Sequence, residues 1–185
     1  MGRPTDGDGP TDHPDLTGIA GEMRAEWRAE QESAAADAAA QWRHTRGLSD
    51  WLCDRMHAGD RIAVSVAARS FVGLVEEVGD DLVALRCGFG RVEIHACAAV
   101  PISFTVVEHA TEGGTRAFAR RGFRDALMAR DAHARARVGT LERPEGIDGS
   151  LLVSRDFVAV VASGGAETII PIAHIAWVSA WVGPA

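Results

Sequence analysis

Two stretches of the chain, one beginning near Arg61 and the other near Arg135, repeat the same pattern of apolar and polar positions. In the first, Gly73 opens a run rich in Val and Leu that ends at Leu85, and in the second Gly149 opens a similar run that ends at Val160. Short apolar runs with alternation, separated by Gly and Asp, are typical of β-strands joined by turns. The pattern therefore predicts the same strand-rich unit twice.

Each unit is expected to contain five strands. The turns lie at glycine-containing segments such as Gly79-Asp80 and Gly164-Gly165. A proline on the last strand of the first unit, Pro101, fits an edge or a strand start. The expected strands are 62–66, 71–78, 82–87, 92–95 and 100–107 in the first unit, and 135–141, 149–153, 156–162, 168–172 and 176–182 in the second.

Three segments have helical spacing of apolar residues. A long helix is predicted over residues 15–46, a short one after the N-cap residue Ser49, and a third from Arg116 to about His133. The long helix either lies on the strands or in solvent, or it pairs with a second copy. Its apolar positions, spaced by three or four residues in most cases, are Leu16, Ala20, Met23, Trp27, Ala34, Ala38 and Trp42.

A short helix followed by five bent strands, with a Gly in strand two and an Asp at the next turn, resembles the Sm-like fold, a small SH3-like barrel. The whole chain is similar to an uncharacterised bacterial family with an N-terminal helix and two such barrels. Its patterns, GxVxxVGxDxVxL and a VVPLAAV-like stretch, are matched within 73–85 and at 169–175. The resemblance implies a mainly β fold with helices: two tandem Sm-like barrels, each preceded by a helix, plus the long N-terminal helix.

This interpretation divides the chain into segments. We expect a disordered tail over 1–14, because its Gly, Pro and Asp content cannot support a core. The long helix follows over 15–46, the first barrel with its helix over 47–107, a linker over 108–115, and the second barrel with its helix over 116–185.

The RNA site of Sm and Hfq proteins is not implied here. Those proteins bind uridine-rich RNA through an Asn and aromatic residues in one motif and a positively charged loop in another. This chain has no Asn, and the corresponding loops, 87–91 and 163–167, share no basic signature. A fold alone does not define a function.

Arginine is the only basic residue among the 19 Lys and Arg positions, which a GC-rich genome explains without selection for phosphate binding. A basic stretch could still contact phosphates, or it could be a solvated helix face. The candidate nucleic-acid contacts in it are Arg116, Arg120, Arg121, Arg124, Arg135 and Arg137. The net charge of −7 is concentrated in residues 1–40, so the rest of the chain is nearly neutral.

Cysteine and histidine give weak signals. Cys87 and the pair His95 and Cys97 have no second close pair, so we predict no metal site, no cofactor and no catalytic residues. The three cysteines form no CxxC motif, which favours a reducing compartment, and we expect a cytoplasmic protein without a signal peptide or membrane span.

Large apolar side chains give the best candidates for a protein interface. Trp177 and Trp181 are four residues apart on a predicted strand and share a face; they either close the second barrel or form an exposed anchor. The candidate interface residues are Met23, Trp27, Trp42, Trp177 and Trp181.

Three functions remain open from the sequence. We favour a non-catalytic intracellular interaction or regulatory module that binds a protein partner or a second copy of itself. The alternative is an RNA- or DNA-binding protein that uses the arginine-rich helix between the barrels. The third and least supported is an enzyme.

Overall fold

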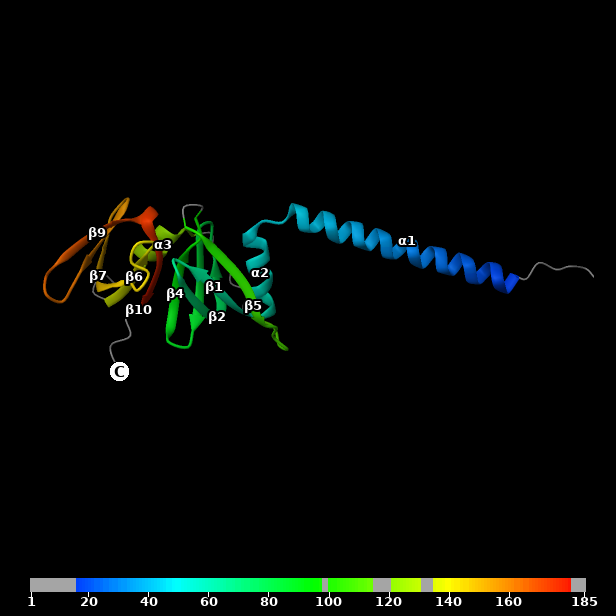
Figure 1. Cartoon of the computed structure of the whole chain (residues 1–185), viewed down its shortest axis with the longest axis horizontal. Helices are drawn as coiled ribbons and strands as arrows, with labels where there is room; N and C mark the ends of the chain where they lie inside the picture. Colours follow the sequence, from blue (N-terminus) through cyan, green and yellow to red (C-terminus); the bar gives the residue numbers. More distant parts are fainter. Residues whose placement is uncertain (1–15, 98–99, 115–120, 131–134, 181–185) are drawn as a thin grey trace, which may run out of the picture. The chain divides into compact units, whose positions relative to one another are not determined.

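The computed structural model describes residues 16–97, 100–114, 121–130 and 135–180, and Figure 1 shows their course. The chain forms two compact units, residues 1–46 and 47–185. The first contains one helix, α1 (Leu16–Thr45), as the long apolar spacing predicts. None of the described side chains of α1 is buried, and only Ala40 is even half-buried.

The second unit begins with α2 (Leu48–Ala58), a helix defined by its caps. The Asp50 carboxylate accepts the Gly47 N–H at 3.0 Å, and Gly59 ends the helix in the left-handed region with φ of 81°. Leu52 and Met56 lie on one face and are each only 1% exposed. This buried face fixes α2 against the strands that follow.

Ten antiparallel strands form one sheet, so the described chain is mainly β with helices. Along the sheet the order is β5-β1-β2-β3-β4-β10-β6-β7-β8-β9. The strands are β1 (Arg61–Val66), β2 (Arg69–Val78), β3 (Leu82–Cys87), β4 (Gly90–His95), β5 (Ile102–Glu108), β6 (Arg135–Thr140), β7 (Ile147–Val153), β8 (Phe157–Val161), β9 (Glu167–Pro171) and β10 (Ile175–Ala180). A short 3-10 helix, η1 (Ile172–His174), joins β9 to β10.

The strand order repeats. Each half of the sheet places its fifth strand first, and then the other four in sequence order, and the halves join where β4 pairs with β10. Among the described strands we see one open sheet and not two closed barrels. The sheet is continuous because the free edge of β4, the last strand of the first half, pairs with β10 of the second half. The two outer edges are β5 and β9.

Two glycines in matching places align the two halves of the sheet. A Cβ on Gly73 would stand 2.5 Å from the Arg86 carbonyl oxygen, and a Cβ on Gly149 would stand 2.6 Å from that of Val161. Only glycine permits this close approach of backbones. Aligning these positions superposes the registers of the two halves. Phe71 then corresponds to Ile147, Ile94 to Ile170, and Trp177 to Ser103.

The two hydrophobic cores share strands across the junction. Trp177 of β10 belongs to the core of the first half, and Leu82 of β3 belongs to the core of the second half. Phe123 and Leu127 of α3 (Phe123–Met128) complete the second core and are fully buried. Each half therefore contributes side chains to the other, and the two halves pack as one unit.

The third helix is shorter than its predicted span of 116–133, of which 116–120 and 131–134 lie outside the described residues. Residues 121 and 122 are not helical, and α3 has only six residues. The reason is local packing. A Cβ on Gly79 would meet the Arg121 carbonyl oxygen, so the chain passes directly over the β2–β3 turn before the helix begins. The Asp81 carboxylate then caps the helix by accepting the Phe123 N–H at 2.5 Å.

Candidate functional site

The junction between β4 and β10 is the best-defined contact surface in the second unit. Ile94 lies opposite Trp177, Glu93 opposite Val178, and Val92 opposite Ser179. These side chains are all nearly inaccessible to solvent. A second contact supports the ladder, because Nδ1 of His95 donates to the Ile175 carbonyl oxygen at 3.1 Å. The junction is thus a buried strand-to-strand interface in which β4 pairs with β10 in antiparallel orientation.

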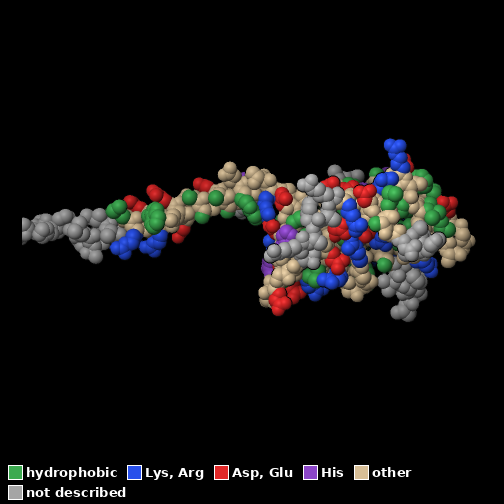
Figure 2. All heavy atoms as spheres, turned by 180° about the vertical axis from the view of Figure 1, so that it is seen from behind, with side chains coloured by type: hydrophobic (Ala, Val, Ile, Leu, Met, Phe, Trp, Pro, Cys, Tyr) green, Lys and Arg blue, Asp and Glu red, His purple; other side chains and the backbone are tan. Residues whose placement is uncertain are grey.

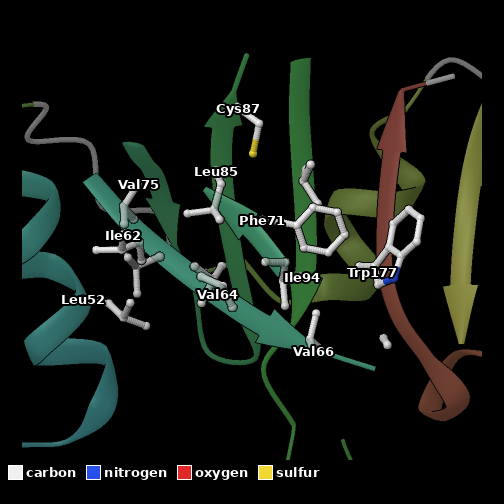
Figure 3. Packing of buried hydrophobic residues seen from close by; sticks show 14 of the residues in the cluster. Leu52, Ile62, Val64, Val66, Phe71, Val75, Leu85, Cys87, Ile94 and Trp177 are labelled. Atoms are coloured by element: carbon white, nitrogen blue, oxygen red, sulfur yellow. The ribbon is translucent and has the colours of Figure 1, made fainter. Parts of the chain in front are cut away.

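Trp177 fills a slot in the first half from the second half. Its indole contacts Phe71 edge-on, with ring centroids 5.1 Å apart. Figure 3 shows the two side chains next to each other in the core. The Arg69 guanidinium lies 5.8 Å from the indole ring. A Cβ at Gly139 would stand 2.1 Å from the indole, so the ring occupies the space that a side chain at Gly139 would need. Trp177 is 1% exposed, which places it in the core and not on an exposed anchor surface.

Charged side chains form a network that includes Glu93 of this junction. Glu77, on β2, pairs with both Arg91 and Arg121, and Glu93, on β4, accepts from Arg130 at 2.8 Å and Arg91 at 3.2 Å. The hydrogen bond from Arg121, together with that from Arg91, holds the pKa of Glu77 below its usual range, although burial opposes the shift. Figure 2 shows acidic and basic side chains lying next to one another on one face of this unit. The network ties the segment before α3 to the first half.

The predicted nucleic-acid contacts do not form one basic stripe in the described residues. Arg116 and Arg120 lie outside those residues. Arg121 is paired with Glu77, and Arg137 forms a two-point pair with Asp148 at 2.6 and 2.7 Å. Arg124 has a buried Nε without a partner among the described residues, and Arg135 is exposed at the start of β6. Arg121 and Arg137 therefore form ion pairs within the fold.

The predicted protein-interface residues divide between the two units. Met23, Trp27 and Trp42 of α1 are 66%, 63% and 54% exposed. The Arg46 guanidinium lies 3.9 Å from the centroid of the Trp42 ring, on its face. Trp177 is buried, and Trp181 lies outside the described residues. Of the predicted interface residues that the structure describes, those on α1 are the accessible ones.

The outer edges of the sheet carry a second set of accessible groups. Ile169 on β9 is 55% exposed, and Leu141, which follows β6, is 46% exposed. Both line a pocket of about 360 Å³ beside the β9 edge. Residue spacing alone predicts neither the pocket nor its neighbourhood, because the alternation in 167–171 also fits a buried strand. The pocket can be predicted only by aligning the two repeats, which requires the register of their strands.

The histidine and cysteine candidates have structural roles. His95 stacks on Phe123 at 4.5 Å, and its Nε2 lies 3.3 Å from the Asp81 carboxylate. The Sγ of Cys97 is 3.7 Å from Nδ1 of His95, and Cys87 is buried, with its thiol pKa raised to about 11 by burial. Among the described residues, no three His, Cys, Asp or Glu side chains gather as a metal site. His95 instead links α3, β4 and β10.

Asp60 holds one end of the outer strand β5. Its carboxylate accepts the Ala110 N–H at 2.9 Å and pairs with Arg55 at 2.8 Å and with His109 at 3.2 Å. Although burial raises the pKa of Asp60, these partners outweigh that effect and lower it below its usual range. All these contacts link neighbouring elements, so they hold the end of α2, the start of β1 and the end of β5 together.

No protein-family model, no curated protein and no solved structure matches this chain. The functional argument therefore depends on the surfaces described above. Among the helices in the described part of the chain, none combines the length and the apolar character needed to cross a membrane.

Proposed function

We propose that the chain is a non-catalytic, cytoplasmic interaction or regulatory module built from tandem Sm-like barrels, in which α1 is the docking helix for a protein partner. The observation that carries the proposal is the exposure of Trp27 and Trp42 on a helix that buries none of its described side chains. Tryptophan is the residue most enriched at energetically important contacts between proteins.

The physical argument concerns the stability of α1. A helix of 30 residues gains most of its stability in a protein from burying one face, and α1 has no such face among its described side chains. Its alanine run, 34–40, has high helix propensity and keeps the backbone helical. A partner that covers the tryptophans would supply the missing burial. Docking of α1 on a protein surface would both cover the exposed tryptophans and give the helix a buried face.

The tandem Sm-like part of the proposal is supported by the repeated strand order and by the matching close approaches at Gly73 and Gly149. In this interpretation each half is one barrel unit that opens toward its neighbour, and the β4–β10 ladder is the contact between the two units. The cytoplasmic assignment is supported by three cysteines that form no disulfide, of which Cys87 is buried.

Nucleic-acid binding is the alternative function. Exposed Arg135 and the predicted contacts Arg116 and Arg120 leave it testable, but it is less well supported because Arg121 and Arg137 already form ion pairs with carboxylates. Phosphate contacts by those two residues would require these pairs to break. An aromatic platform for bases would also be needed beside the arginines.

The test is quantitative affinity enrichment with the full chain as bait, in nuclease-treated extract. We compare the wild type with a Trp27→Ala/Trp42→Ala variant and with a control, Arg28→Ala/Glu32→Ala, on the same helix. The proposal predicts a defined protein partner that is lost with the tryptophan variant and kept with the control. Retention of the partner by the tryptophan variant would contradict it.

A parallel measurement tests the alternative. Fluorescence anisotropy of a single-stranded RNA pool is measured at low and at near-physiological salt against the wild type and an Arg116→Ala/Arg120→Ala/Arg124→Ala variant. Binding at micromolar affinity that weakens steeply with salt and is lost in the variant would establish nucleic-acid binding. Absence of binding at low salt would remove that function.

A further inference from the structure

The pocket beside β9 corresponds to a slot that is filled in the other half of the sheet. Its walls include Ile147 on β7 and Ile170 on β9. By the register of the repeat, these residues match Phe71 and Ile94. In the first half, Trp177 packs on Phe71 and lies opposite Ile94 (Figure 3). In the second half, no described side chain takes the place of Trp177, and the pocket of about 360 Å³ remains.

The β9 edge beside this pocket presents backbone groups suited to a further strand. The Ile172 N–H donates to the Asp156 carbonyl at 2.8 Å, in the same register as the β8–β9 ladder. Hydrogen-bonded and non-bonded pairs alternate in an antiparallel ladder, so the Ile169 N–H and C=O point away from β8. Ile169 corresponds to Glu93, a residue of β4 within the β4–β10 ladder.

Pro171 limits the edge without blocking it. It corresponds to His95, which lies just beyond the three residue pairs that join β4 to β10. Its missing N–H is therefore outside the stretch that a partner strand would use. A proline at this place shortens the ladder that can form and protects the edge from unspecific strand pairing. A short ladder needs an anchoring side chain to reach useful affinity.

From these observations we propose that the β9 edge and its pocket bind an extended segment of a partner protein, which adds as an antiparallel strand and places a large aromatic side chain in the pocket. The aromatic residue lies opposite Ile170, as Trp177 lies opposite Ile94. Addition of a strand supplies main-chain hydrogen bonds, and the side-chain pocket supplies selectivity. This site lies on β9 and does not involve α1, so it goes beyond the proposed function and can fail independently of it.

A second copy of this chain fits the site less well. The other outer edge, β5, carries Ser103 at the position that corresponds to Trp177. A serine hydroxymethyl group leaves most of an indole-sized slot unfilled, and an apolar slot without contacts forfeits most of the packing energy. Pairing of β9 with β5 of another molecule would therefore satisfy the backbone groups but not the pocket.

The natural probe is the strand that fills the equivalent slot. A fluorescein-labelled peptide with the sequence of residues 174–180, His-Ile-Ala-Trp-Val-Ser-Ala, is titrated with the full chain and followed by anisotropy. We expect saturable binding. A peptide carrying Trp177→Ser should bind at least about tenfold more weakly, because aromatic anchors dominate such contacts.

Two variants of the protein test the edge. Ile169→Pro removes the outward N–H without removing a hydrogen bond to β8, and we expect binding of the peptide to weaken about tenfold or more. Ile169→Ala keeps the N–H and is the matched control, with affinity within about threefold of the wild type. Circular dichroism melting of both variants verifies that each is folded.

Three results would overturn the proposal. The first is no binding of the wild-type peptide, and the second is equal binding of the Trp177→Ser peptide. The third is concentration-dependent self-association of the protein, measured by light scattering, that Ile169→Pro abolishes; this would assign the edge to a second copy. The Trp27→Ala/Trp42→Ala variant should bind the peptide like the wild type. Loss of peptide binding at the β9 edge and loss of partner binding at α1 can therefore be told apart.

Discussion

Removal of the Trp177 indole should destabilise the second unit strongly. The side chain is 1% exposed and packs on Phe71 across the junction of the two halves. Burial of a tryptophan removes about 200 Å² from water, which at about 25 cal/mol per Å² gives an upper estimate of about 5 kcal/mol. Measured Trp→Ala losses in cores of about 3–5 kcal/mol agree with this value. We therefore expect Trp177→Ala to lower the unfolding free energy by about 4 kcal/mol.

The assay is urea denaturation followed by circular dichroism, because the loss of an indole would confuse a fluorescence signal. Trp27→Ala is the matched control: it makes the same chemical change at a side chain that is 63% exposed, and we expect a change within about 0.5 kcal/mol. A loss at Trp177 as small as that at Trp27 would refute the inference that the indole joins the two halves.

Three further outcomes follow from the contacts. Glu77→Gln, which removes the carboxylate partner of Arg121 and one of the carboxylates around Arg91, should lower the unfolding free energy by about 2 kcal/mol at pH 7. Because the pKa of Glu77 is lowered in the folded state, the stability it contributes is complete above the ordinary value of 4.5 and is lost as pH falls through the folded pKa, so denaturation curves of wild type and variant should converge in acid. Gly149→Ala should lower the melting temperature, since its Cβ would stand 2.6 Å from the Val161 carbonyl, whereas Gly164→Ala, with open space around it, should not. Cys87, with a thiol pKa of about 11, should resist iodoacetamide at pH 8 until the protein is unfolded, as mass spectrometry of the labelled chain would show.

Sequence patterns predict much of the local structure. Strand alternation places most strands within a few residues of their observed bounds, and the matched glycines Gly73 and Gly149 identify the repeat. These features are local: they depend on side chains that alternate on a strand and on turns that need glycine. A helix does lie within the predicted third helical span, but it begins only at Phe123, because Arg121 is held by Glu77, 44 residues away in sequence, which no local pattern contains.

The joining of the halves lies beyond local patterns as well. Trp177 is recognisable as a large apolar strand residue, but its position in the core of the other half depends on the β4–β10 register. The pocket beside β9 depends on the same register, since it is defined by the absence of a matching indole. Helical spacing alone predicts Trp27 and Trp42 as candidate interface residues, because that spacing is the same whether or not a partner is present, and both are exposed on α1.

Amide hydrogen exchange tests the docking role of α1 most directly. Exchange is followed by mass spectrometry on the purified full chain and on the complex recovered by affinity enrichment. The proposed function predicts fast exchange across residues 21–46 in the free chain and strong protection of the segment from Trp27 to Trp42 in the complex. Unchanged exchange in that segment, with new protection confined to 121–140, would contradict the role of α1 and point instead to the arginine-containing segment.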